Sequence, residues 1–391
     1  MQKEYDALSG EEVEVKPQRQ RTHNYFDYSL LFVWIFIMLL GYVLLYSASS
    51  YMALSKQGDS AFYLKRQIRS TLIGCLAMIP VTLIDYRMWK KLDKIIYFGS
   101  IATVFMVLSP LGISSHGAKR WVGAGPIQFQ PSELVKIGVI VMTAYMISKC
   151  SDTTLKNTKT CYQIFALSAV GAGLLFVITS NLSSAIIVVL ISAVMLIIAG
   201  AGRQFILSLC GMGGIGLAGL ILLSSVAGKS FRASRILVWL HPEEYSSSGG
   251  YQVMQGLYAI GSGGLFGKGL GNSAQKLGFV PEATNDMIFS IICEELGIFG
   301  AICIILLFVF MIRRMRVIAS NAPDLYGSML VIGVLAHISI QVILNIAVVT
   351  NSIPNTGVSL PFISYGGTSL AFLMIEIGMV LSVSRRIKKI R

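Results

Sequence analysis

Charged residues are scarce in this sequence. Asp, Glu, Lys and Arg make up 13% of its 391 residues, whereas hydrophobic residues make up 54% and the mean hydropathy is +0.69. A water-soluble domain of this length needs a more polar surface than this composition provides. The composition therefore argues against a soluble protein and predicts a polytopic membrane protein.

Cysteine and histidine are also few and widely spaced. The six cysteines form no Cys-x-x-Cys pair, and the four histidines share no ligand spacing. These patterns argue against a disulfide scaffold and a structural zinc site. Basic residues are more numerous, giving a net charge of +13, but they are spread between apolar runs. We therefore expect no nucleic-acid partner.

The apolar residues occur in runs of about 20, the length that a helix needs to cross the hydrocarbon core. We predict an all-α bundle of about ten transmembrane helices within residues 28–384, after a polar tail (1–27) and before a basic tail (385–391). The predicted spans cover residues 28–50, 69–86, 94–114, 132–148, 162–179, 183–200, 204–226, 286–312, 328–349 and 360–383.

The basic residues predict the orientation of the chain, because Lys and Arg are retained on the cytoplasmic side. With the N-terminus inside, 20 Lys and Arg lie on the inner side and 11 on the outer side. Both termini are therefore expected in the cytoplasm. The long connection at about 227–285 then lies on the outer face, where we expect a partly helical loop whose apolar stretch 251–264 lies at the interface. The net positive charge of the outer face favours an anionic substrate.

Asp286 lies where this loop meets the eighth predicted span, beside Met287, Ile288 and Phe289. Neighbouring apolar surface raises the pKa of a carboxylate, which suits it to act as a general base. Alternatively, Asp286 caps the N-terminus of the following helix. The residues alone leave both interpretations open.

Glu133 and Lys136 share a helix face at the start of the fourth span, close in sequence to Lys119 and Arg120. They form either a helix-end ion pair or part of a polar cavity.

We interpret the other polar residues within the predicted spans as structural. We expect Glu294 and Glu295 to bond to neighbouring helices, and His337, Gln341 and Asn345 to form a stripe that does the same. Glu376 is expected nearer the cytoplasmic end, isolated from the outer-face residues and paired with a basic neighbour.

The glycine-rich run at residues 261–272 is not a phosphate-binding P-loop, because Gly269 follows Lys268 where Ser or Thr is needed. Most of its glycines are expected to permit tight turns. A second interpretation is that its amides and Lys268 bind a lipid-linked pyrophosphate.

Four motifs together resemble the SEDS proteins, the family of FtsW, RodA and SpoVE. They appear in the family's order over about residues 117–385, and the ten-span layout agrees. The motifs are GAKRWV…QPSELVK (117–136), GYQVMQGLYAIGSGGLFGKGLGNS (250–273), PEATNDMIFSIICEELG (281–297) and NTGVSLPFISYGGTSL (355–370).

The resemblance implies a peptidoglycan glycosyltransferase that polymerises lipid II on the outer face of the bacterial plasma membrane. It also implies a class B penicillin-binding protein as partner, within the divisome or elongasome. By motif, Asp286 corresponds to the family's essential acidic residue, Glu133 and Lys136 to its functional pair, and Arg120 to its motif arginine. The sequence departs from the pattern at Thr284-Asn285, where His-Thr is common, and at Thr368, where Ser is common.

We hypothesise an inverting transfer in which Asp286 activates the acceptor hydroxyl. Arg120, Lys136 and either Arg235 or a divalent cation such as magnesium or manganese would stabilise the departing pyrophosphate. The alternatives are a lipid II flippase and a non-catalytic scaffold for a cell-wall synthase. The run NIAVVTNSIPNTG (345–357) leans towards division-type members.

Overall fold

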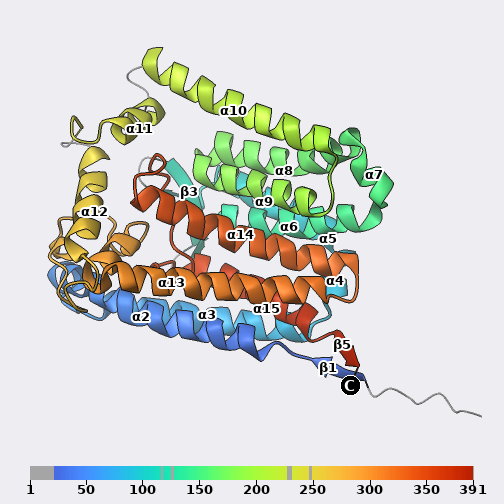
Figure 1. Cartoon of the computed structure of the whole chain (residues 1–391), viewed down its shortest axis with the longest axis horizontal. Helices are drawn as coiled ribbons and strands as arrows, with labels where there is room; N and C mark the ends of the chain where they lie inside the picture. The colour runs from blue at the N-terminus through green and yellow to red at the C-terminus, as the bar shows by residue number, and fades with distance from the viewer. Residues whose placement is uncertain (1–21, 116–117, 125–126, 227–230, 246–248, 391) are drawn as a thin grey trace, which may run out of the picture.

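The computed structural model describes residues 22–390 except 116–117, 125–126, 227–230 and 246–248 (Figure 1). The chain is mainly helical, with two small sheets. The long helices are α2 (Tyr28–Gln57), α3 (Phe62–Leu83), α5 (Asp93–Met106), α6 (Pro131–Lys149), α8 (Thr158–Thr179), α9 (Leu182–Ile198), α10 (Arg203–Val226), α13 (Ile288–Ser320), α14 (Leu325–Val349) and α15 (Thr368–Ser384).

Each of the ten predicted spans coincides with one of these helices, which confirms the all-α, multi-pass membrane architecture. By length and composition, α2, α6, α8, α13 and α14 qualify as membrane-crossing helices, and α9 and α15 are shorter apolar helices. The remaining elements are α4 (Tyr86–Lys91), α7 (Asp152–Lys156), α11 (Phe231–Leu240), α12 (Gly249–Gly263), the 3₁₀ turn η1 (Gln275–Leu277), β1 (Thr22–Tyr25), β2 (Gly112–Ser115), β3 (Ala118–Ala124), β4 (Ile127–Phe129) and β5 (Ile387–Ile390).

Several predicted boundaries are wrong. The last span begins at Thr368 rather than at residue 360, because Pro361 and the Gly366-Gly367 pair keep the preceding segment in turns and Gly367 has a φ of +47°. The second begins at Phe62 rather than at residue 69, so its first turns carry basic side chains. The eighth begins at Ile288 and continues to Ser320.

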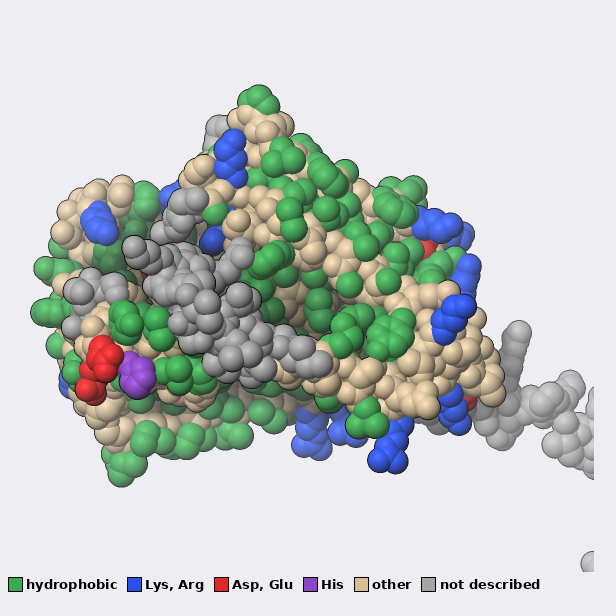
Figure 2. Space-filling model, turned by 90° about the horizontal axis from the view of Figure 1, so that it is seen from above, with side chains coloured by type: hydrophobic (Ala, Val, Ile, Leu, Met, Phe, Trp, Pro, Cys, Tyr) green, Lys and Arg blue, Asp and Glu red, His purple; other side chains and the backbone are tan. Residues whose placement is uncertain are grey.

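Both described chain ends lie at one end of the bundle, where β1 pairs antiparallel with β5 (Figure 1). We name this the terminal end, and the opposite end, which carries α12 and η1, the distal end. At the terminal end, Asp27 caps α2 at Leu30 N and pairs with Arg314 of α13 at 2.6 Å. Many Lys and Arg side chains gather on the terminal half of the surface in Figure 2. Ten membrane crossings return the chain to the side of the membrane on which it starts. The position of both described chain ends at the terminal end therefore agrees with ten spans.

Helix α13 breaks at Gly297, whose φ is +68°, and the glycine-rich loop that follows α12 fills the break. Lys268 N and Gly269 N donate to the carbonyls of Glu294 and Glu295, each at 2.9 Å. On the other side of the break, Ile298 N donates to Gly264 O at 3.0 Å. The loop thus satisfies backbone groups that the interrupted helix leaves free, as a helix break within a membrane protein requires.

Close approach explains the glycines at this junction. A Cβ added to Gly267 would lie 2.2 Å from Glu295 O, and Gly267 has a φ of +77°. A Cβ added to Gly263 would lie 2.0 Å from Cys293 O. Any side chain at these positions would separate the loop from α13. The positive φ angles of Gly264, Gly267, Gly269 and Gly271 confirm the expectation that most glycines here permit tight turns, and the structure adds the close contacts with α13.

Candidate functional site

Asp286 lies in a turn at the distal end, just before α13 and outside the spanning helices. The turn is closed by a hydrogen bond from Asn285 N to Glu282 O at 2.9 Å. The N-cap position of α13 is Met287, and no described side chain caps that helix. The interpretation of Asp286 as a helix cap is therefore wrong, and its 7%-exposed side chain is left for other contacts.

Three consecutive carbonyls hold the Asp286 turn in place. Thr284 O accepts from Tyr365 N at 2.9 Å, and Asn285 O accepts from the Ser364 hydroxyl at 2.7 Å. Asp286 O accepts from Asn345 Nδ2 at 2.8 Å.

The donors to these carbonyls are themselves fixed. Asn345 Nδ2 also donates to Val358 O at 2.8 Å, and the Ser364 hydroxyl accepts from Leu360 N at 2.8 Å. Gln67 of α3 donates to Ser364 O at 3.2 Å. We name this set of bonds from Asn345, Ser364 and Tyr365 the carbonyl clamp. It ties the turn to α14 and to the segment before α15, and Gln67 of α3 in turn holds that segment, so the position of Asp286 is set by three parts of the chain.

The Asp286 carboxylate is buried. Burial is the main cause that raises the pKa of Asp286 to about 6, and the nearby charge of Glu282 adds to it. Two weaker effects lower the pKa of Asp286. Gln252 of α12 donates to Asp286 Oδ2 at 3.4 Å, and the positive charge of Arg235 favours the ionised carboxylate. A carboxylate with this pKa is ionised at neutral pH yet basic enough to accept a proton.

Arg235 lies within electrostatic range of this carboxylate, and Arg120 lies within electrostatic range of Arg235. Burial is the main cause that lowers the pKa of Arg235. The charge of Arg120 lowers it further, whereas the charge of Asp286 raises it. Arg235 donates to Asn355 O at 3.1 Å, and Arg120 donates to Ser180 O at 3.4 Å. Arg120 Nε is buried and has no hydrogen-bond partner among the described residues. Two neighbouring guanidinium groups repel each other, so their proximity suits an anion that neutralises both.

Glu133 and Lys136 form a buried ion pair at 2.9 Å, as one of the two interpretations of the sequence expected. The charges of Glu133 and Lys136 act on His337 of α14, and the charge of Lys136 also acts on Glu376 of α15. His337 Nδ1 and Glu376 Oε2 are 2.7 Å apart. The expectation that Glu376 pairs with a basic neighbour is met by His337, whereas the expectation that Glu376 is isolated from the outer-face residues is wrong, because the charge of Lys136 acts on it. Because α14 and α15 pack together, Glu376 meets His337.

Lys268 has a carboxylate partner in the structure. Its Nζ lies 2.7 Å from Glu294 Oε1 and 2.9 Å from the Ser262 hydroxyl. Lys276 pairs with Glu295 at 2.8 Å, and Glu295 also accepts from Ser47 of α2. Glu294 therefore fixes the glycine-rich loop to α13, and Glu295 joins α13 to η1 and to α2, which confirms their expected structural role. The side chain of Lys268 takes part in the same junction.

Two contributors to the site were not identified from the sequence. Gln252 reaches Asp286 from α12, and Ser364 holds the turn from the segment before α15. The motifs at 250–273 and 355–370 contain these residues, but a motif alone does not say which side chains meet.

A metal centre made by protein ligands is not evident. No group of three or more His, Cys, Asp or Glu side chains that could hold an ion occurs among the residues that the structure describes. Near Asp286 the described carboxylate is Glu282, whose own side chain accepts from Asn285. The expectation of a magnesium or manganese ion is not tested by these observations.

The chain is similar to known proteins along nearly its whole length. Residues 27–389 match the family of FtsW, RodA and SpoVE, described as cell cycle proteins. Stage V sporulation protein E of Bacillus subtilis is 38% identical over 92% of this chain and 97% of its own. A probable peptidoglycan glycosyltransferase FtsW of Geobacter sp. strain M18 is 35% identical over 93% of this chain and 98% of its own.

Solved structures show the same fold. A chain of a peptidoglycan synthase complex, studied for the coordination of polymerization and crosslinking, superposes with a TM-score of 0.74 at 25% identity, covering 92% of this chain and 98% of that chain. The rod shape determining protein RodA of Thermus thermophilus superposes with a TM-score of 0.65 at 25% identity, covering 93% and 97%.

Proposed function

The chain belongs to the family of FtsW, RodA and SpoVE, and from this premise we propose that it is a peptidoglycan glycosyltransferase that polymerises lipid II. The observation that carries the proposal is the buried Asp286 carboxylate, which the carbonyl clamp holds within electrostatic range of Arg235, itself within electrostatic range of Arg120. The two relatives described above are named for sporulation and for peptidoglycan glycosyl transfer. A fixed base beside paired cations is what glycosyl transfer from a lipid pyrophosphate requires.

Asp286 acts as the general base in this proposal. It accepts the proton of the acceptor sugar's hydroxyl as that oxygen bonds to the anomeric carbon of the donor. The bond from the anomeric carbon to the pyrophosphate oxygen breaks, and the configuration inverts. Arg120 and Arg235 stabilise the negative charge that develops on the leaving pyrophosphate. Positioning supplies most of the acceleration, and the base contributes a further ~10²–10⁴-fold.

Lys136 and Lys268 have different places in the proposal. Both are paired with glutamates, Lys136 with Glu133 and Lys268 with Glu294. A lysine that is paired with a carboxylate still attracts an anion at longer range, but the pair has no net charge. We assign the close pyrophosphate contacts to the arginines, because a guanidinium group binds phosphate oxygens in a bidentate manner, and we regard the two lysines as substrate-binding groups of secondary strength. A magnesium or manganese ion would add charge at the same place, which titration with a chelator tests.

The orientation in the membrane follows from charge. The terminal end carries the Lys- and Arg-rich segments, so we assign it to the cytoplasm and the distal end with Asp286 to the outer face. Lipid II would then be used on the outer leaflet of the bacterial plasma membrane. A class B penicillin-binding protein is the expected partner, because a similar chain is part of a complex that couples polymerization to crosslinking. The proposal also includes other divisome or elongasome membrane proteins as partners.

The test is polymerisation of labelled lipid II by the purified full chain in liposomes, with and without the co-expressed transpeptidase. Asp286→Asn should abolish polymer, whereas Asp59→Asn, which changes an exposed carboxylate in the turn between α2 and α3, should not. Lipid II translocation measured on the same liposomes separates a polymerase from a flippase. Translocation without polymer would contradict the proposal, and wild-type activity of Asp286→Asn would contradict the assigned base. Normal cell growth with Asp286→Asn would favour a scaffold.

A further inference from the structure

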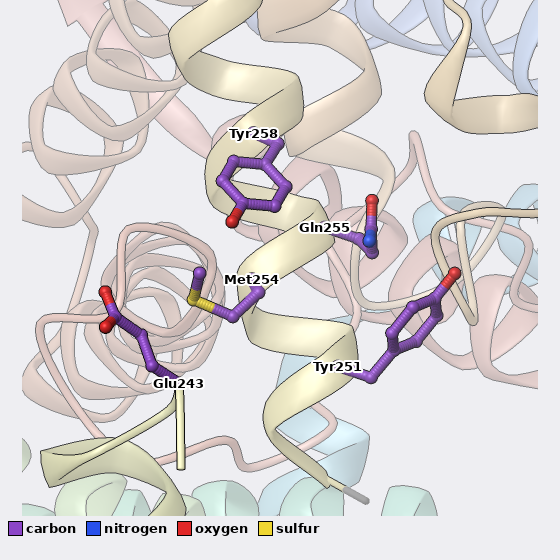
Figure 3. Close-up of a pocket in the computed structure, with 5 residues that line it drawn as sticks. All are labelled: Glu243, Tyr251, Met254, Gln255 and Tyr258. Carbon is purple, nitrogen blue, oxygen red and sulfur yellow. The ribbon is translucent and has the colours of Figure 1, made fainter. Parts of the chain in front are cut away.

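A pocket on α12 lies outside the catalytic contacts described above. It is lined by one residue after α11 and by four residues of α12: Glu243, Tyr251, Met254, Gln255 and Tyr258 (Figure 3). Tyr251 and Tyr258 remain 37% and 53% exposed, so their rings face a space that the protein itself does not fill. Helix α12 runs crosswise to the bundle at the distal end (Figure 1).

The pocket adjoins the Asp286 site through Gln252. On a helix each residue turns by about 100°, so Gln255 is rotated about 60° from Gln252 and Tyr251 about 100° in the same direction. Gln252 itself donates to Asp286 Oδ2. The face of α12 that contacts Asp286 therefore continues around the helix into the pocket. A polymeric substrate whose end reacts at Asp286 can extend along this face.

The lining has the chemistry of a carbohydrate site. Two tyrosine rings offer flat apolar faces to the C–H groups of a pyranose, while the Gln255 amide and the Glu243 carboxylate can bond to hydroxyl and acetamido groups. Tyr251 and Tyr258 are seven residues apart, which places them about 10 Å apart along the helix. This spacing lets each ring contact a different sugar of one strand.

We propose that this pocket binds the sugars of the growing glycan strand beyond the reacting residue, and so retains the strand between additions. The inference rests on the proposed polymerase function and deepens it. Among the residues that the structure describes, the lining contains no Lys or Arg and one carboxylate, so it favours an uncharged, hydroxyl-rich ligand over a lipid phosphate. Retention of the strand would determine product length and leave the chemistry of each transfer to Asp286.

The experiment compares the full-length wild type with the double variant Tyr251→Ala/Tyr258→Ala. Two quantities are measured on labelled lipid II: the rate at which the first glycosidic bond forms and the mean strand length. We expect first-bond formation within about twofold of wild type and strands shorter by about threefold to tenfold per ring removed. Tyr251→Phe/Tyr258→Phe keeps both rings and should retain long strands. Tyr51→Ala removes a 49%-exposed tyrosine from the distal part of α2 and should change neither quantity.

Direct binding makes the result independent of catalysis. A soluble β-1,4-linked N-acetylglucosamine hexamer, titrated into the same proteins, should bind wild type and Asp286→Asn but bind the double alanine variant at least about tenfold more weakly. Unchanged hexamer binding or unchanged strand length in that variant would overturn the proposal. The proposal would also be overturned if the double alanine variant changed only the amount of transpeptidase that co-purifies with it, or only the amount of protein that is retained in vesicles. Binding of the hexamer by a wild-type protein that makes no polymer would refute the polymerase function alone.

Discussion

Replacing Asp286 by Asn should make the protein more stable as well as inactive. A carboxyl whose pKa is raised by burial favours its protonated form in the folded state. The difference between about 6 when folded and the ordinary value of 3.8 corresponds to about 3 kcal/mol of unfolding free energy. The neutral asparagine removes this penalty while leaving a side chain of similar volume.

The sign of the pH dependence follows from proton binding. Between pH 3.8 and about 6 the folded protein holds a proton on Asp286 that the unfolded chain has released. Stability contributed by this group is therefore lost as the pH rises through that window. The advantage of Asp286→Asn should grow from about 1 kcal/mol at pH 4.5 to about 3 kcal/mol at pH 8.

Thermal unfolding in detergent, followed by tryptophan fluorescence at the two pH values, measures this advantage. An increase of a few degrees at pH 8 and a smaller one at pH 4.5 is expected for a chain of this size. Asp59→Asn is the control, because the hydrogen bond from Lys65 lowers the pKa of Asp59 and its removal should bring no gain. If Asp286→Asn were no more stable than wild type at pH 8, the buried, unpaired setting of the carboxylate would be refuted.

Four further predictions follow from the site and the helix break. Polymerisation by the wild type should fall as the pH drops through about 6, because the base becomes protonated; a flat profile down to pH 5 would contradict this. Ser364→Ala should lower kcat by about tenfold or more with little change in KM, since it loosens the Asp286 turn. Its control is Ser382→Ala, which removes a similar hydrogen bond to Ile84 O and should leave kcat unchanged. Gly267→Ala should destabilise the fold by about 2 kcal/mol or more, because the added Cβ would collide with Glu295 O and the residue has a positive φ. Its control is Gly261→Ala on helix α12, where the Cβ meets open space, so that variant should be neutral or stabilising in the same melting assay. Glu376→Gln should retain polymerisation, because its contact with His337 is structural; loss of activity in folded protein would place this pair in the mechanism.

The sequence alone determined the number and positions of the long helices and identified Asp286 as a candidate base. Both depend on local properties: hydropathy summed over about 20 residues, and a carboxylate beside an apolar run. Helix boundaries were less certain where basic or glycine-rich residues adjoin a span, as at Phe62 and Thr368.

The tertiary structure decided which side chains meet, because packing brings together residues whose separation along the chain carries no signal. Ser47 and Glu295 are 248 positions apart, and Asn345 and Asp286 are 59 apart, yet each pair is joined by a hydrogen bond. The sequence could not tell whether Asp286 caps α13, because it would be the N-cap if the helix began one residue earlier, at Met287 rather than at Ile288. Nor could it show that Glu376 contacts His337, since that contact exists only when α14 and α15 pack side by side.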